Sequence, residues 1–175
     1  MKLRQFALIA GLLTAAVISG SPPITPLVSP QRIIPAGEVL DLNGLRDIEF
    51  GDTEDELTRR GILRTDVRGC GQTLAGHTAI SPVFVDDRLV LLWLADSTQT
   101  TEGVGVGSPL RQVRVRYPQL TPLHPPQGTY RLDGLLARDG DRAYLFLHDG
   151  RTVRKVIAGY ADWAERLFSE GHGPC

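Results

Sequence analysis

Several features that mark common protein classes are missing from this sequence. It has no excess of either charge, because 19 lysines and arginines face 20 aspartates and glutamates, for a net charge of −1. A chain without a basic excess has no electrostatic reason to bind nucleic acid or an anionic membrane surface. The histidines His77, His124, His148 and His172 do not fall at zinc-site spacings, and no His-Glu-x-x-His segment occurs. We therefore expect no nucleic-acid partner, no metal and no cofactor.

Motifs of common enzyme classes are missing as well. No Gly-x-Ser-x-Gly segment, which marks the nucleophile of many hydrolases, is present. Gly103, Gly105 and Gly107 lack the G-x-G-x-x-G spacing of a dinucleotide site, and we interpret them as tight packing of a strand against a helix start. We predict that the protein is not an enzyme. Because catalytic groups assemble from residues distant in sequence, a small hydrolase with His77 or His148 near an aspartate is the alternative.

Acidic residues gather in short segments with two interpretations. The segments Asp86-Asp87, Asp139-Gly140-Asp141 and Asp149-Gly150 offer the oxygen donors that calcium takes, but none matches a calcium-binding loop. Aspartate is common in turns because its side chain bonds the nearby backbone, so we interpret all three as turns. Glu54-Asp55-Glu56 is interpreted as a first helical turn, where acidic groups complement the helix dipole, in preference to an acidic binding patch.

The N-terminus has the three-part layout of a secretory signal peptide. Lys2 and Arg4 precede an uncharged, mostly apolar run over residues 6–18 and the small residues Ser19-Gly20-Ser21. This run is shorter than the roughly 20 apolar residues that span a bilayer. We expect residues 1–20 to be a signal peptide and the protein to be extracellular or in the cell envelope. After processing it would keep no stable membrane span; an uncleaved anchor is the alternative.

Cysteine is scarce, and the pair that occurs fits an exported protein. Disulfides persist in oxidising compartments, and with only Cys70 and Cys175 the connectivity is fixed. A crosslink over so long a loop is worth roughly 4–5 kcal/mol at most. It would hold the C-terminal tail against the first half of the chain. Free or intermolecular thiols are the alternative.

The rest of the chain divides into a spacer and two similar parts. Residues 21–40 contain five prolines, which favour an extended spacer. Residues 48–57 align with residues 104–113 at a constant offset of 56. In both copies, alternating apolar residues precede a glycine, a helix-capping residue and a short amphipathic segment. We interpret this as a duplication, with module 1 over 41–100 and module 2 over 101–175.

Each module is predicted to contain a short helix. Thr53 and Glu56 form a capping box for the first helix, which ends at Gly61. Ser108-Pro109 is a favoured start for the second helix, which ends before Pro118.

Antiparallel strands are predicted after each helix. Module 1 has a hairpin of residues 83–85 and 88–94. Module 2 has a meander of residues 129–137, 142–148 and 151–157, with turns at the Asp-Gly pairs, and then a last helix over 160–168. The predicted fold class is therefore α+β, with two tandem modules, each a short helix followed by an antiparallel sheet, and a C-terminal helix.

The repeated segment resembles one found in a group of exported actinobacterial proteins. The second copy, residues 101–108 followed by Arg116-Tyr117-Pro118, matches the pattern better; the first copy, residues 44–53, lacks the middle glycine. More distantly, the layout is similar to the tandem helix-plus-sheet modules of β-lactamase inhibitory protein and of the outer-membrane assembly lipoprotein BamE. The resemblance covers residues 44–175, and its motifs include no catalytic residue. It implies a protein-binding or envelope-associated module.

One strand carries the candidate binding face. Alternation places Arg142, Tyr144, Phe146 and His148 on one side of it, and aliphatic residues on the other. If the aliphatic side packs on a helix, the aromatic side is exposed, and tyrosine and arginine are enriched at interface hot spots. The alternative is that the C-terminal helix covers the aromatic side, with Trp163 packed on it.

The predicted function is that of an exported, non-catalytic protein-binding or envelope-associated module, with inhibition of an extracellular enzyme as one role. Its expected partner is another exported or envelope protein. This hypothesis predicts an exposed aromatic patch and no deep pocket. The hydrolase alternative predicts a concave site with converging titratable groups. A third hypothesis is a structural wall-associated protein that uses the spacer for reach.

Overall fold

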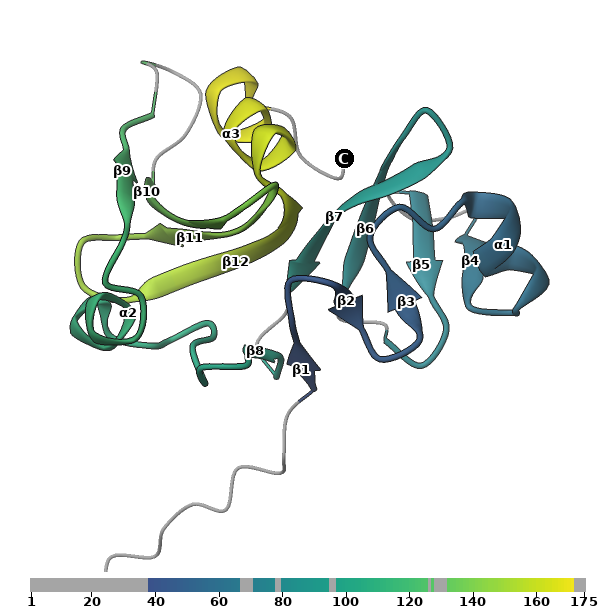
Figure 1. The fold of residues 1–175 in the computed structure, drawn as a ribbon, viewed down its shortest axis with the longest axis horizontal. Coiled ribbons are helices and arrows are strands. Elements are labelled where there is room, and N and C mark those ends of the chain that lie inside the picture. Colours follow the sequence, from purple (N-terminus) through teal and green to yellow (C-terminus); the bar gives the residue numbers. More distant parts are fainter. Residues whose placement is uncertain are drawn as a thin grey trace, which may run out of the picture. The chain divides into compact units, whose positions relative to one another are not determined.

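The computed structural model describes residues 38–66, 71–77, 80–94, 97–125, 127 and 132–171. The chain divides into Met1–Ile33 and the unit Ile34–Cys175, which contains all the described residues. The predicted signal peptide, most of the predicted spacer, Cys70 and Cys175 lie outside them. The described part is α+β, mostly strands with a few helices, one of them C-terminal (Figure 1). The predicted fold class is confirmed at this level.

Most of the strands belong to one antiparallel sheet with the order β6-β7-β12-β11-β10-β9. Short pairs accompany it: β1 with β8, β2 with β3, and β4 with β5. The strands are β1 Val39–Leu40, β2 Gly44–Leu45, β3 Ile48–Glu49, β4 Leu63–Asp66, β5 Gly71–Leu74, β6 Ser81–Val85, β7 Arg88–Leu94, β8 Gln99–Thr100, β9 Thr121–Leu123, β10 Asp133–Asp139, β11 Arg142–His148 and β12 Val153–Tyr160. The helices are α1 Glu54–Arg59, α2 Leu110–Arg116 and α3 Ala161–Glu170.

The predicted hairpin and meander are found, with their turns at the aspartates. The outer strands of the meander are β10 and β12 in place of 129–137 and 151–157, and residues 129–131 lie outside the described ones. Asp86 and Asp87 join β6 to β7 with φ values of 49° and 62°, the left-handed backbone that a tight hairpin turn needs. Between β11 and β12, the Asp149 carboxylate accepts the N–H groups of Arg151 and Thr152, both at 2.9 Å. These side-chain-to-backbone bonds are the reason that aspartate favours turns.

The helix boundaries follow local chemistry in one case and depart from it in another. Thr53 and Glu56 form the predicted capping box, and Gly61 follows α1 with φ 71°. The prediction that Ser108 caps α2 is wrong, because Pro109 occupies the cap position. The Ser108 hydroxyl instead accepts the N–H of Gly105 at 3.0 Å, so it braces the glycine-rich loop and not the helix.

Both faces of the large sheet are buried. On one face, the aliphatic side chains of β11 pack with Ala161, Ala164, Leu167 and Phe168 of α3. On the other face, Tyr144 and Phe146 pack in a core that includes residues of α2 and of the short strands β1, β2 and β3. Strand β11 therefore lies between two hydrophobic layers.

The predicted exposure of the aromatic face of β11 is wrong. Tyr144 is 2% exposed and Phe146 is fully buried. The alternation of the strand and the packing of its aliphatic side on a helix are both observed. The aromatic face is covered all the same, because Tyr117 packs against it, with its ring centroid 5.1 Å from that of Phe146. The alternative, coverage by α3 and Trp163, is also wrong, since α3 packs on the opposite face.

The aligned segments of the two halves make equivalent hydrogen bonds. Each segment pairs with the start of the second strand of a hairpin, β7 in one half and β12 in the other. In the first half, the Gly51 N–H donates to the Leu89 carbonyl, and the Leu89 N–H donates to the Asp52 carbonyl. In the second half, the Gly107 N–H donates to the Val153 carbonyl, and the Val153 N–H donates to the Ser108 carbonyl. All four distances are 2.8–2.9 Å. Equivalent donors and acceptors are 56 residues apart in the segments and 64 apart in the strands. The halves also share one sheet, because β7 pairs with β12.

Candidate functional site

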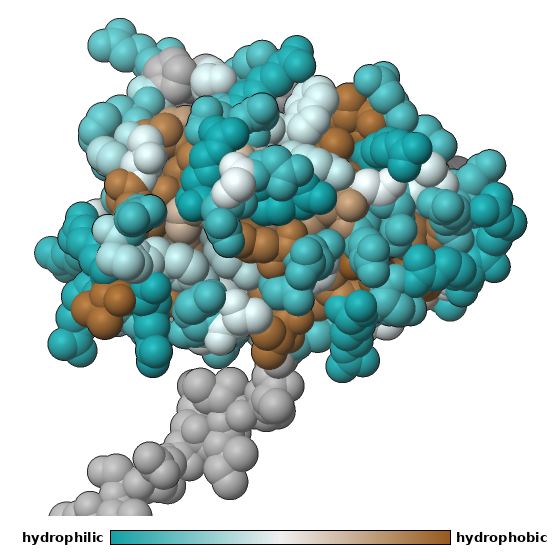
Figure 2. Space-filling view, viewed as in Figure 1, coloured by the Kyte–Doolittle hydropathy of each residue, from teal (hydrophilic) through white to brown (hydrophobic). Residues whose placement is uncertain are grey.

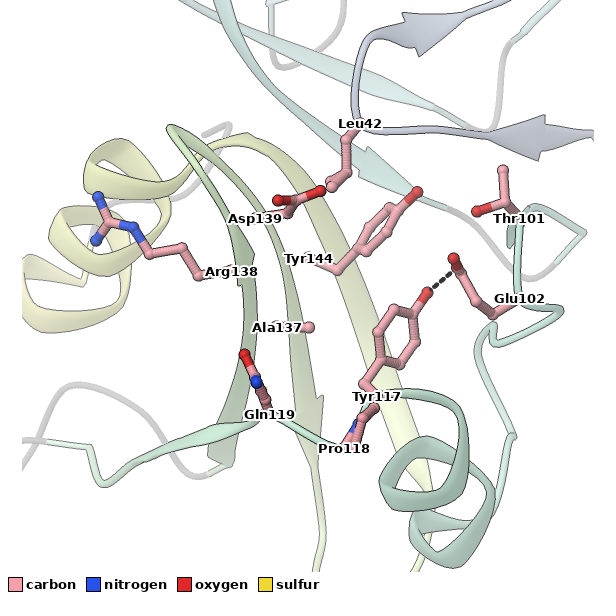
Figure 3. Close-up of a pocket in the computed structure, with 10 residues that line it drawn as sticks. All are labelled: Leu42, Thr101, Glu102, Tyr117, Pro118, Gln119, Ala137, Arg138, Asp139 and Tyr144. Carbon is pink, nitrogen blue, oxygen red and sulfur yellow. Dashed lines mark hydrogen bonds between the residues drawn. The ribbon is translucent and has the colours of Figure 1, made fainter.

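A hollow of about 370 Å³ lies where the loop after β1 meets segments between Thr101 and Tyr144 (Figure 3). We call it the Glu102 hollow. Its wall comes from the loops after β1 and β8, the end of α2, and strands β10 and β11. The lining residues are Leu42, Thr101, Glu102, Tyr117, Pro118, Gln119, Ala137, Arg138, Asp139 and Tyr144.

A tyrosine and a glutamate brace one side of the hollow. Tyr117 follows the last residue of α2, and its hydroxyl donates a hydrogen bond to the Glu102 carboxylate (Figure 3). The same hydroxyl lies 2.7 Å from that of Thr100 in β8. These contacts join the end of α2 to the loop after β8, so the carboxylate is held in place before any ligand arrives.

Burial and this hydrogen bond keep the two groups in defined protonation states. Burial raises the pKa of Tyr117, and the bond to Glu102 raises it further. Burial also raises the pKa of Glu102, but hydrogen bonds from Tyr117 and Thr101 outweigh it and leave the pKa below its usual range. At neutral pH the tyrosine therefore keeps its proton and the glutamate is ionised.

Tyr144 forms the floor of the hollow. Its ring centroid is 5.7 Å from that of Tyr117, and its hydroxyl donates to the Leu40 carbonyl at 3.0 Å. Burial raises the pKa of Tyr144, so this group also stays protonated. In Figure 3 the Tyr144 ring lies between the carboxylates of Asp139 and Glu102.

The charge of the hollow is uneven. Arg138 belongs to the lining, but its guanidinium points away from the other lining side chains (Figure 3) and pairs with Asp162 at 2.6 Å and Glu165 at 3.3 Å, both on α3. Among the described residues, no cation forms an ion pair with Glu102 or Asp139. In the described part of the chain, the hollow thus presents carboxylates beside aromatic rings, and no cation there pairs with them.

The residues of the predicted binding face have other roles. Arg142 stacks on the Tyr160 ring, 3.6 Å from its centroid, and pairs with Asp141 at 2.6 Å. His148 is buried, and its Nδ1 accepts the Gly150 N–H at 3.1 Å. Together with the buried Tyr144 and Phe146, they form no shared surface; of the four, only Tyr144 lines the Glu102 hollow. The Cys70–Cys175 pair lies outside the described residues.

The described histidines, which include His77 and His148 of the hydrolase alternative, do not line the hollow. The Nδ1 atom of His77 lies 2.6 Å from the Glu38 carboxylate, and that of His124 lies 3.2 Å from the Asp133 carboxylate. His148 faces Asp133 in the strand register, and loss of solvent lowers its pKa. None of these histidines lines the Glu102 hollow.

The surface offers little exposed apolar area in the described residues. The exposed large hydrophobic side chains there are Val39, at 54%, and Val115, at 79%. Figure 2 shows a face that is mostly hydrophilic, with hydrophobic areas between hydrophilic ones. The predicted exposed aromatic patch is therefore not found in this part of the chain. A smaller apolar hollow of about 330 Å³ lies between the β6–β7 hairpin and α3.

Sequence reasoning missed the residues that make the Glu102 hollow. Glu102 and Tyr117 entered only as members of the second copy of the repeated segment, and Asp139 only as a turn residue. A usable signal lay in the alignment of the two copies. At the offset of 56, Glu102 and Tyr117 align with Arg46 and Gly61, so the motif common to both copies does not require them.

Comparison of the chain with family models, with curated proteins and with solved structures finds no match. Within the described ranges, none of the helices has the length and apolar character needed to cross a bilayer. In the same ranges, no three histidine, cysteine, aspartate or glutamate side chains gather as metal ligands do.

Proposed function

We propose that this chain is an exported, non-catalytic protein-binding module, built from two tandem helix-plus-sheet repeats, that binds another exported or envelope protein through the Glu102 hollow. Inhibition of an extracellular enzyme is one way in which such binding would act. The signal-peptide layout of residues 1–20 supports export. The equivalent hydrogen bonds of Gly51 and Gly107 support the duplication.

The observation that carries the proposal is a lined hollow in which Tyr117 holds the Glu102 carboxylate, and the direction of the pKa shifts agrees with it. General acid–base catalysis works best when the pKa of the catalytic group lies near the operating pH. Here the pKa values of Tyr117 and Tyr144 are raised and that of Glu102 is lowered, so all are moved away from neutrality. Groups with pKa values so far from neutral pH are better suited to binding a ligand than to transferring its protons.

The construction of the hollow also suits binding. Hydrogen bonds hold Tyr117, Glu102 and Tyr144 in place, which lowers the entropy lost when a partner is bound. At the rim, Thr101 and Gln119 are exposed and offer polar contacts. The volume of about 370 Å³ is near the lower end of ligand pockets, roughly 300–1,000 Å³, and suits a partner's side chain.

A steric block tests this proposal. Gln119→Trp adds bulk at the exposed rim, whereas Val115→Trp adds the same ring at an exposed position of α2 outside the lining. The mature protein and both variants would be immobilised and exposed to envelope and culture-fluid fractions of the source cells. We expect a protein that wild type and Val115→Trp retain to bind Gln119→Trp at least about tenfold more weakly, a change of roughly 1.4 kcal/mol in the binding free energy. Equal retention by all three would contradict the proposal.

A further inference from the structure

We infer that the Glu102 hollow recognises one cationic side chain of its protein partner, the guanidinium of arginine or the ammonium of lysine. The inference rests on the proposed function and gives its site a chemical specificity. Glu102 and Asp139 line the hollow, and Arg138, the one basic lining residue, is bound to α3. An anionic ligand would meet two carboxylates and, among the residues that the structure describes, no free cation, whereas a cation would be attracted.

The aromatic wall favours the same ligand class. A guanidinium or ammonium within about 6 Å of an aromatic ring is attracted by the negative face of the ring. Tyr117 is only partly buried and lines the hollow together with the Tyr144 ring. This chain already contains such a contact, since Arg142 stacks 3.6 Å from the centroid of Tyr160.

The remaining lining fits the rest of a long basic side chain. Leu42, Pro118 and Ala137 provide apolar surface for the methylene stem, which lysine and arginine bury while their charged ends bind elsewhere. The Glu102 carboxylate accepts hydrogen bonds from Tyr117 and Thr101, and its charge attracts the N–H donors of a cationic ligand.

The first copy of the repeat supports a dedicated role for Glu102. At the offset of 56, the first copy has Arg46, of opposite charge, although its backbone hydrogen bonds are equivalent. The acidic group therefore belongs to the second half of the chain alone. If Glu102 were needed to hold the repeat together, an acidic residue would be expected at the equivalent position of the first copy as well.

The test uses neutral and charged probes of equal shape. The mature ¹⁵N-labelled chain would be titrated with the Nα-acetyl amides of arginine, of lysine and of citrulline, the uncharged counterpart of arginine. We expect shifts of the amide signals of residues 101–103, 117, 119 and 138–139 with a Kd in the millimolar range, typical of a single side chain at about −4 kcal/mol. One or both cationic probes should bind at least about tenfold more tightly than citrulline, and the tighter one identifies the partner's residue.

Variants separate recognition from folding. Glu102→Gln keeps an oxygen that accepts the Tyr117 hydrogen bond, so the fold should persist while affinity for the cations falls at least about tenfold. Asp139→Asn should cause a smaller loss, and Glu49→Gln, an exposed change on β3, should cause none. Equal binding of citrulline, unchanged affinity of Glu102→Gln, or no shift with any probe would overturn the inference. The proposed function fails separately, if capture of a partner is insensitive to Gln119→Trp.

Discussion

Tyr117 connects helix α2 to the loop after β8 through a single hydroxyl. Replacing it by phenylalanine keeps the ring but removes the bond to the partly buried Glu102 carboxylate. Hydrogen bonds to charged groups contribute about 1.5–3 kcal/mol, so we expect a stability loss in that range. The pKa of Glu102 should rise, because burial then acts with less opposition. Carboxyl NMR titration and urea unfolding measure the two effects.

The matched control is Tyr160→Phe. The Tyr160 ring stacks under Arg142, and this stacking survives the loss of the hydroxyl. We expect its unfolding free energy to change by less than about 0.5 kcal/mol, as for most substitutions away from buried networks. If the pKa of Glu102 is the same in Tyr117→Phe and wild type, the description of the hollow is incorrect.

His148 gives the fold a pH dependence of known sign. Its pKa is lowered by loss of solvent, so the folded state favours the neutral ring, whose Nδ1 accepts the Gly150 N–H. The unfolded chain takes up this proton near pH 6.5, before the folded chain does. His148 therefore makes its full contribution to the free energy of unfolding above about pH 7.5. This contribution falls as the pH drops through 6.5, by at most about 1.4 kcal/mol per pH unit.

Urea unfolding of wild type and His148→Gln from about pH 5 to about pH 8 checks this dependence. The difference between the two proteins should shrink on acidification, because wild type alone loses the contribution of a neutral His148. A difference that stays constant, or that grows toward low pH, would show that His148 is not held neutral by the fold.

Among the elements, β12 joins the two halves, and Gly159 allows it to approach β7. Its φ is 143°, and a Cβ at this position would collide with the Val90 carbonyl oxygen. We expect Gly159→Ala to cost more than about 3 kcal/mol, because two paired strands must separate. Gly140→Ala, in the open turn between β10 and β11, should cost only about 1 kcal/mol for its left-handed backbone. Similar losses in the two variants would contradict this packing.

The elements that could be predicted from the sequence are those with local causes. The capping box of Thr53 and Glu56 and the aspartate turns depend on residues a few positions apart, and all are found. The short strands β1, β2, β3 and β8 have too few residues for a periodic pattern. Strand β1 pairs with β8, Val39 opposite Gln99, across a separation that no local pattern reveals. These missed strands belong to the cover over the aromatic face of β11, which explains the wrong prediction of its exposure.

The candidate site could not be predicted from local patterns either, because its residues are also distant from one another in the sequence. Tyr144 bonds to the Leu40 carbonyl, 104 residues away, and Tyr117 reaches Glu102 across a separation of 15 residues. Alternation correctly grouped Tyr144 with Phe146, but it could not show which distant segment lies over them. Only the packed chain places an acidic loop residue beside two tyrosines.

For the whole molecule, the predicted export favours an oxidised cysteine pair. The mature chain from an oxidising compartment should show no free thiol and a monomeric mass without reductant. Cys175→Ser should lower the unfolding free energy by about 2–4 kcal/mol, the typical worth of a disulfide. Two titratable thiols, or a disulfide-linked dimer, would contradict the Cys70–Cys175 bond.

The most direct measurement is photocrosslinking from the rim of the Glu102 hollow. A diazirine amino acid no larger than glutamine, which leaves the rim open, would replace Gln119 in the full chain, expressed in the cells that export it, with replacement of Val115 as control. The account predicts an adduct with another exported or envelope protein from position 119 alone. Nα-acetyl-arginine amide or its lysine counterpart should reduce that adduct, and the citrulline amide should not. No adduct from position 119, or equal adducts from both positions, would contradict it.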